Sequence, residues 1–183
     1  MIESELDVLR DISERLTSAG VAFMLTGSVA MNHYAEPRMT RDIDLVVDLG
    51  TDQIDLVMNL FENDYYTDRQ AVANAIARRS IFNLIHNKTV IKLDFIVLKA
   101  NQYRHEEFER RKQIKLEDFQ TWIVSREDLI LSKLYWARDS KSELQLRDVR
   151  NLLASECDLD YMYSRAENLG IKPLLDEVIE TNE

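Results

Sequence analysis

Two neighbouring segments, VAFMLTGS (residues 21–28) and RMTRDIDLVVD (residues 38–48), set the pattern of the chain. The first is a short apolar run suited to a buried strand, and Gly27 and Ser28 interrupt it before a helical turn or two at 29–34. The second has the β-branched composition of a strand. The two segments therefore predict a unit of strand, Gly-Ser turn, short helix and strand.

The segments on either side complete a mixed architecture. Apolar spacing predicts a helix that ends near Gly20, and the residues around Asn87 and Lys88 predict a β-hairpin. Further helices are expected at 51–62, 70–79 and 103–111, the hairpin strands at 80–86 and 89–98, and one more strand at 119–124. From Arg126 onward the spacing is helical throughout. The fold class is thus α/β, a small mixed sheet flanked by helices (1–125) with a C-terminal helical region (126–183) packed on it.

Composition narrows the possible classes of protein. The chain has 183 residues, 45% of them hydrophobic, and a formal net charge of −10. This length suits one domain of ordinary size, or one domain with a small helical appendage. No apolar stretch is long enough for a membrane span, and the N-terminus lacks the build of a signal peptide, so we expect a cytoplasmic protein without a membrane partner. The single Cys157 and the absence of Cys/His spacing mean that any metal must bind to oxygen ligands.

Three aspartates supply such ligands. Asp42 and Asp44 are two residues apart on a strand, so their side chains share one face, and Asp94 interrupts an apolar strand. If the two strands are neighbours, three carboxylates converge and suit Mg²⁺ or Mn²⁺. The alternative is that Asp42 and Asp44 are the solvated side of an edge strand, with Asp94 in a salt bridge to Arg38, Arg41 or Lys92.

These residues, Gly27-Ser28, Arg38-x-Thr40-x-Asp42-Ile43-Asp44 and Asp94, resemble the signature of the polymerase-β-type nucleotidyltransferase superfamily. The nearest likeness is to small bacterial members related to AbiEii toxins, and it covers nearly the whole chain, although many AbiEii-like toxins have Gly-Gly at this turn. The resemblance implies that the Gly-Ser turn, with Arg38 and Thr40 nearby, holds the triphosphate of an NTP. It also implies that the three aspartates bind two Mg²⁺ ions for nucleotidyl transfer.

The helical region resembles these relatives at Lys133 and at Arg147-Asp148. Lys133 is expected to neutralise triphosphate charge, and the alternative for it is a solvated or snorkelling lysine. Arg147 and Asp148 are assigned to the nucleotide site, or alternatively to a structural ion pair that ties the helices to the sheet.

Two other groups of residues have weaker functional interpretations. The basic residues between Arg104 and Lys115 could contact RNA, but the acids among them favour a solvated helix face. Trp122, Tyr135 and Trp136 are expected in the core, although Tyr135 or Trp136 could stack on a base.

The expected function is Mg²⁺-dependent transfer of an NMP group from an NTP to a hydroxyl acceptor on a protein, tRNA or other RNA, or a small molecule. The alternative is a non-catalytic nucleotide-binding or interaction protein with the same fold. Either protein could be one component of a toxin and antitoxin pair, with the cognate toxin or antitoxin as its partner. An antibiotic-modifying enzyme is a substrate variant of the first, and the acidic net charge would suit a cationic aminoglycoside.

Overall fold

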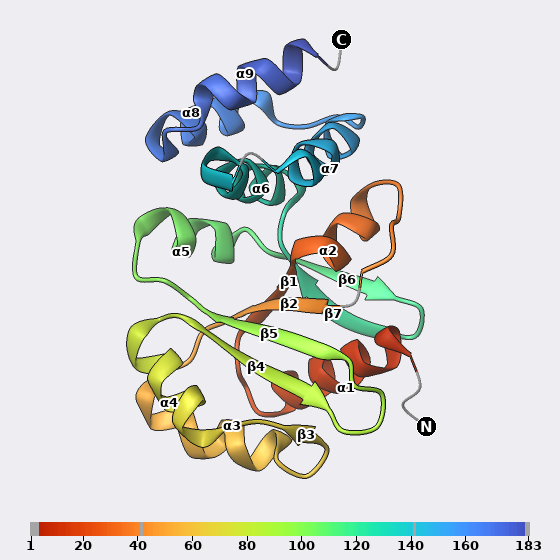
Figure 1. Ribbon diagram of the computed structural model, residues 1–183, viewed down its shortest axis with the longest axis vertical. Coiled ribbons are helices and arrows are strands. Elements are labelled where there is room, and N and C mark those ends of the chain that lie inside the picture. The colour runs from red at the N-terminus through yellow and green to blue at the C-terminus, as the bar shows by residue number, and fades with distance from the viewer. Residues whose placement is uncertain (1–3, 41, 141, 182–183) are drawn as a thin grey trace.

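The computed structural model describes residues 4–40, 42–140 and 142–181, and a seven-stranded mixed sheet lies at its centre (Figure 1). The strand order is β3-β4-β5-β2-β1-β7-β6. The strands are β1 (Phe23–Thr26), β2 (Asp42–Val47), β3 (Tyr65–Tyr66), β4 (Ile81–His86), β5 (Lys92–Val97), β6 (Lys112–Leu116) and β7 (Phe119–Ile123). β2 pairs parallel with β5, β1 pairs parallel with β7, and the other pairs are antiparallel.

Helices cover both faces of the sheet. The helices are α1 (Glu5–Ser18), α2 (Gly27–Tyr34), η1 (Thr51–Gln53), α3 (Ile54–Phe61), α4 (Arg69–Arg78), α5 (Gln102–Glu109), α6 (Arg126–Ser140), α7 (Glu143–Leu153), α8 (Leu159–Leu169) and α9 (Lys172–Glu180). Figure 1 shows α1, α3 and α4 on one face, and α2, α5 and the α6–α9 layer on the other. The site described below lies on the second face.

The pleat of β2 explains why this central strand carries acids. Ile43, Leu45 and Val47 are fully buried against the α1, α3 and α4 layer, whereas Asp42, Asp44 and Val46 alternate with them and project to the other face. Because period-two alternation separates the two sets of side chains completely, an apolar core and a polar site share one strand without conflict.

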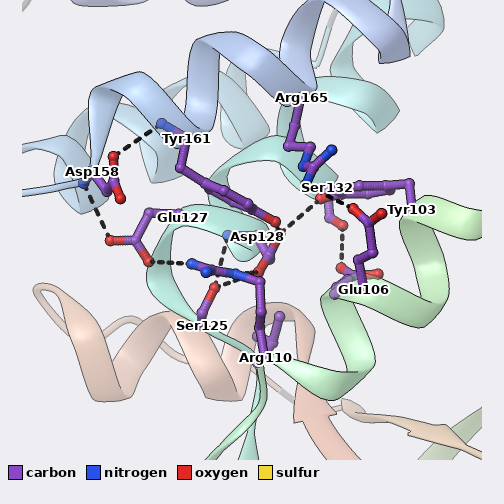
Figure 2. A network of polar contacts seen from close by, with 12 residues as sticks. Tyr103, Glu106, Arg110, Ser125, Glu127, Asp128, Ser132, Asp158, Tyr161 and Arg165 are labelled. Atoms are coloured by element: carbon purple, nitrogen blue, oxygen red, sulfur yellow. Dashed lines mark hydrogen bonds and ion pairs between the residues drawn. The ribbon is translucent and has the colours of Figure 1, made fainter.

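The C-terminal helices are attached through a buried carboxylate at the start of α6. Asp128, 0% exposed, accepts hydrogen bonds from Ser125 (2.6 Å), Arg110 (3.0 Å) and Tyr161 (2.7 Å), with Tyr103 at 3.3 Å (Figure 2). These partners come from α5, from the residues flanking α5 and α6, and from α8. One carboxylate therefore fixes three helices relative to one another, as expected for a buried charge that keeps all its oxygens paired.

Sequence reasoning placed most elements but missed two strands. The helix and strand expectations from 5 to 111 are confirmed within a few residues, and the hairpin is β4–β5. The structure adds β3, which has two residues, and β6 at the sheet edge, whose lysines were assigned to a basic run rather than to a strand. Lysine is common on edge strands because it discourages pairing with other chains. The lysines of β6 made this segment resemble a charged surface run instead of a strand. Among the described residues, no helix is both long and apolar enough to cross a membrane.

Candidate active site

The site begins with the pairing of β2 and β5, which places two of the predicted acids side by side. In this parallel register Asp44 lies opposite Asp94, and Asp42 lies opposite Lys92. Burial, followed by the charges of Asp94 and then Asp42, raises the pKa of Asp44 from 3.8 to about 6. The sheet therefore concentrates negative charge at Asp44 that the nearby lysines, Lys133 and Lys92, do not fully offset.

The turn after β1 fits closely around Asp44. Gly27 opens α2 with a φ of +64°, and a Cβ atom built on it would lie 2.0 Å from Oδ2 of Asp44. Only glycine combines this backbone conformation with such a close approach. The Gly-Ser turn and the central carboxylate, which are 17 positions apart in sequence, thus form one structural unit.

Asp94 has protein partners in this structure. Its carboxylate lies 2.8 Å from Nζ of Lys92 and accepts a hydrogen bond of 2.5 Å from Asn83. This is the salt-bridge arrangement that the sequence offered as an alternative for Asp94. Within the residues described, no three His, Cys, Asp or Glu side chains are arranged as a complete metal site.

The chemistry of the carboxylates nevertheless fits a divalent cation. Asp42 is exposed, Asp44 is partly buried, and their oxygens are the hard ligands that Mg²⁺ and Mn²⁺ prefer. The raised pKa of Asp44 reflects burial first and then repulsion from Asp94 and Asp42, and a bound cation would relieve that repulsion.

A second cluster, the Asp148 cluster, joins the turn to the helical region. Asp148, 0% exposed, receives Nε and Nη2 of Arg38 at 3.1 and 2.9 Å and Nζ of Lys133 at 2.8 Å. The same Nη2 of Arg38 donates to Oγ of Ser28 at 2.7 Å, and Lys133 also donates to Gln145 at 3.1 Å. Burial opposes ionisation of Asp148, but the hydrogen bonds from Arg38 and Lys133 lower its pKa. Two predicted phosphate ligands are thus held beside Ser28 by one buried anion.

The structure separates the remaining predicted residues. Thr40 donates to the backbone carbonyl of Asp42 at 3.4 Å, at the entry to β2. Arg147 is exposed on α7, where it lines a separate hollow with Glu143, Leu144 and Arg150 and not the cavity that Asp44 lines. Asp148, in contrast, forms the structural ion pairs that the sequence offered as the alternative for this pair.

A cavity of about 760 Å³ opens beside these groups. Gly27, Ser28, Asp44 and Lys133 line one part of it, and its remaining walls come from the open face of β4–β5 and from α5 and α6. Burial lowers the pKa of Lys133, and the Asp148 carboxylate opposes that shift. A cationic side chain and a backbone turn therefore face the same space as the central carboxylate, as a phosphate-bearing ligand requires.

Several residues that line this cavity were not predicted as site residues from the sequence. Trp136 was expected in the core but is 60% exposed and lines the cavity, so that expectation is wrong. Arg104 and Glu107 were read as part of a solvated face, yet Glu107 is 2% exposed and binds both Arg104 and Ser132. Arg78, Ile81 and Lys99 also line the cavity and carried no motif. Their only sequence signal is position, since they flank the ends of β4 and β5.

Comparison with known proteins gives a consistent answer at the level of fold. No family model matches the sequence, and the curated proteins give no significant match. Among solved structures, the lincosamide antibiotic adenylyltransferase LnuA matches with a TM-score of 0.57 and 16% identity, over 83% of this chain and 98% of that chain. The antibiotic-resistance factor ANT(2'')-Ia matches with a TM-score of 0.61 and 11% identity, over 99% and 96%. The chain has the nucleotidyltransferase fold.

A third structure with this fold is an antigenic nucleotidyltransferase-like protein from Paracoccidioides brasiliensis, with a TM-score of 0.58 and 14% identity over 96% of this chain and 92% of that chain. The nucleotidyltransferase fold thus extends over almost the entire chain, α6–α9 included. At such identities the likeness concerns the fold alone.

Proposed function

We propose that this protein is a Mg²⁺-dependent nucleotidyltransferase that transfers an NMP group from an NTP to a hydroxyl acceptor. The observation that carries the proposal is the joint position of Gly27, Asp44 and Lys133 at one end of the cavity. A glycine turn for phosphate, a charged carboxylate for a metal and a cation for the triphosphate are the three components that phosphoryl transfer needs.

Each residue has a defined task in this reaction. The backbone at Gly27 and the hydroxyl of Ser28 bind the triphosphate, and Lys133 and Arg38 offset its charge while Asp148 orients both. Asp42, Asp44 and Asp94 would hold Mg²⁺ or Mn²⁺, which supplies charge stabilisation to the acceptor oxygen and to the leaving pyrophosphate when bound. Asp94, on the β5 side of Asp44, accepts the proton of the attacking hydroxyl after its contact with Lys92 opens.

The acceptor defines the biological role. LnuA and ANT(2'')-Ia are named for antibiotic modification and resistance, and the sequence resembles AbiEii-type toxins, so an antibiotic, a protein or an RNA acceptor are the alternatives. A toxin or antitoxin function would require a cognate protein partner. The non-catalytic alternative is favoured by one observation, namely that Asp94 is engaged by Lys92 and Asn83.

Labelling with an NTP radioactive at the α-phosphate separates enzyme from binding protein. Wild-type protein with Mg²⁺ and a bacterial lysate should transfer label to a protein, an RNA or a small molecule, and Asp94→Asn should bind NTP but transfer at least a hundredfold less label. Equal transfer by Asp94→Asn would remove the proposed role of this residue. A wild-type protein that binds NTP but labels nothing would favour the non-catalytic alternative.

A further inference from the structure

The cavity has two halves on opposite sides of Asp44. On β2, Asp44 is paired with Thr26 of β1 on one side and with Asp94 of β5 on the other. Gly27 and Ser28 follow Thr26, so the phosphate turn lies on the β1 side. The walls formed by Arg78, Ile81 and Lys99 lie past β5, at the ends of β4 and β5.

The geometry of nucleotidyl transfer places the leaving pyrophosphate in one half of the cavity and the acceptor in the other. In an in-line displacement, the attacking oxygen and the leaving pyrophosphate lie on opposite sides of the α-phosphorus. If the β- and γ-phosphates occupy the Gly27 side, the acceptor approaches from the β4–β5 side. We call this side the acceptor half, and define it by Arg78, Ile81, Ile96 and Lys99.

The charge of the cavity contrasts with the charge of the chain. The chain has 33 acidic and 23 basic residues, yet the cavity is lined by five basic side chains, Arg78, Arg79, Lys99, Arg104 and Lys133, and by two acidic ones, Asp44 and Glu107. The cavity lining is therefore mainly basic although the chain as a whole is acidic, and a basic lining favours anionic ligands.

Two of those cations are available to a ligand. Arg104 is paired with Glu107 at 2.7 Å, and Arg79 donates to the carbonyl of Leu98 at 2.6 Å. Arg78 and Lys99 are exposed, and within the described part of the chain their side chains make no ion pair or hydrogen bond. Both residues are in the acceptor half, on the β4–β5 side of the cavity.

Apolar surface lies next to these cations. Val46, Ile96 and Ile81 are direct neighbours across β2, β5 and β4, and they form a row on the floor, with Ile81 49% exposed. Trp136 of α6 lines the same cavity and is 60% exposed. A row of aliphatic side chains and an indole suit the body of a small ring compound.

We propose that the acceptor is a small hydroxyl compound with a ring-shaped body and a phosphate or carboxylate group, which binds to Arg78 and Lys99. This inference rests on the proposed function and specifies its substrate class. A polycationic antibiotic would meet like charges in the acceptor half. A long RNA would meet the acidic surface of a chain with a net charge of −10.

The reaction balances without a further reactant. The acceptor oxygen forms a bond to the α-phosphorus, the bond between the α-phosphorus and the bridging oxygen breaks, and that oxygen leaves with pyrophosphate. The hydroxyl proton passes to Asp94 and then to solvent. The products are the nucleotidylated acceptor and pyrophosphate.

A pair of fluorescent probes tests the binding claim directly. 1-Anilinonaphthalene-8-sulfonate and N-phenyl-1-naphthylamine share one ring system and differ in the sulfonate. We expect wild-type protein to bind the sulfonate probe at least tenfold more tightly than the neutral probe. The double variant Arg78→Ala/Lys99→Ala should lose this tenfold preference and keep its affinity for the neutral probe.

A matched control removes two cations elsewhere. Arg69→Ala/Lys88→Ala changes the net charge equally but alters the start of α4 and the β4–β5 turn, so it should keep the preference. Equal affinity of the wild type for both probes would overturn the proposal. So would a control variant that loses the preference for the sulfonate as much as Arg78→Ala/Lys99→Ala does. Displacement of the sulfonate by a non-hydrolysable ATP analogue with Mg²⁺ would also overturn it, because Arg78 and Lys99 would then serve the nucleotide.

Transfer to natural acceptors is the second measurement. A bacterial small-molecule extract, separated into anionic, neutral and cationic fractions, is incubated with α-labelled ATP, Mg²⁺ and the wild-type protein. Labelled product in the anionic fraction supports the proposal, whereas label confined to the other fractions, to RNA or to protein overturns it. If no fraction is labelled, the probe measurement decides. Failure of ATP·Mg²⁺ to bind the wild type would instead refute the proposed function, which the probes do not test.

Discussion

At the scale of single residues, the contact between Gly27 and Asp44 is the most restrictive feature of the site. We expect Gly27→Ala to abolish NTP binding, because its Cβ would meet Oδ2 of Asp44 at 2.0 Å. The positive φ should also cost about 1 to 3 kcal/mol in unfolding free energy. Isothermal titration with ATP·Mg²⁺ and chemical denaturation measure the two effects.

Gly20→Ala is a matched control for that variant. Gly20 has a φ of +69° and open space around its Cβ position, so the substitution should cause similar backbone strain and leave NTP binding intact. Normal NTP binding by Gly27→Ala would contradict the proposed contact between turn and carboxylate.

Asp44 predicts a pH dependence of stability in the metal-free protein. A carboxyl whose pKa rises from 3.8 to about 6 on folding destabilises the native state as pH increases from 3.8 to above 6, because the folded protein disfavours the ionised form. Asp44→Asn removes this effect and should stabilise the metal-free protein by about 1 to 3 kcal/mol at pH 7.5, and by less at pH 4.5. Urea denaturation at both pH values measures the difference in unfolding free energy between Asp44→Asn and the wild type. A difference that does not increase with pH would contradict the account.

At the scale of elements, α7 holds α2 and α6 together through the Asp148 cluster. Asp148→Ala leaves Lys133 and Arg38 without their buried anion, so we expect a loss of about 3 to 5 kcal/mol in unfolding free energy. NTP affinity should fall as well, because both cations lose their orientation.

Arg147→Ala is the control at the adjacent position. Arg147 is on the exposed side of the same helix, and its removal should change stability by less than about 0.5 kcal/mol. A similar loss in both variants would show that α7 is sensitive to any substitution and that the Asp148 cluster has no special role.

At the scale of the whole molecule, Asp128 of α6 connects α8, through Tyr161, to Arg110 at the end of α5 and to Ser125 before α6 (Figure 2). Tyr161→Phe removes one hydrogen bond to Asp128 and should cost about 1 kcal/mol. Hydrogen exchange should then increase in α8 before it increases in β2 or β5. An equal increase in the hydrogen-exchange rate of all elements would contradict this order.

The sequence predicted the features that depend on local patterns, and it did not predict those that depend on contacts between distant residues. Strand alternation placed Asp42 and Asp44 on one face, and the condition that β2 and β5 are neighbours is met with Asp44 opposite Asp94. The Asp148 cluster joins residues up to 110 positions apart, and no periodicity encodes which of Arg147 and Asp148 points inward. The acceptor half is harder still, because Arg78, Ile81 and Lys99 depend on two strand ends that meet only in the folded sheet.

The central claim is that Asp44 binds a nucleotide through a divalent cation. Thermal unfolding of wild type, Asp44→Asn and the exposed-acid control Asp52→Asn, each with Mg²⁺, with ATP, and with both, tests it most directly. We predict that wild type and Asp52→Asn are stabilised by several degrees only when ATP and Mg²⁺ are present together, and that Asp44→Asn gains nothing from the pair. An equal response of Asp44→Asn, or no response of the wild type to any NTP with Mg²⁺ or Mn²⁺, would contradict the account.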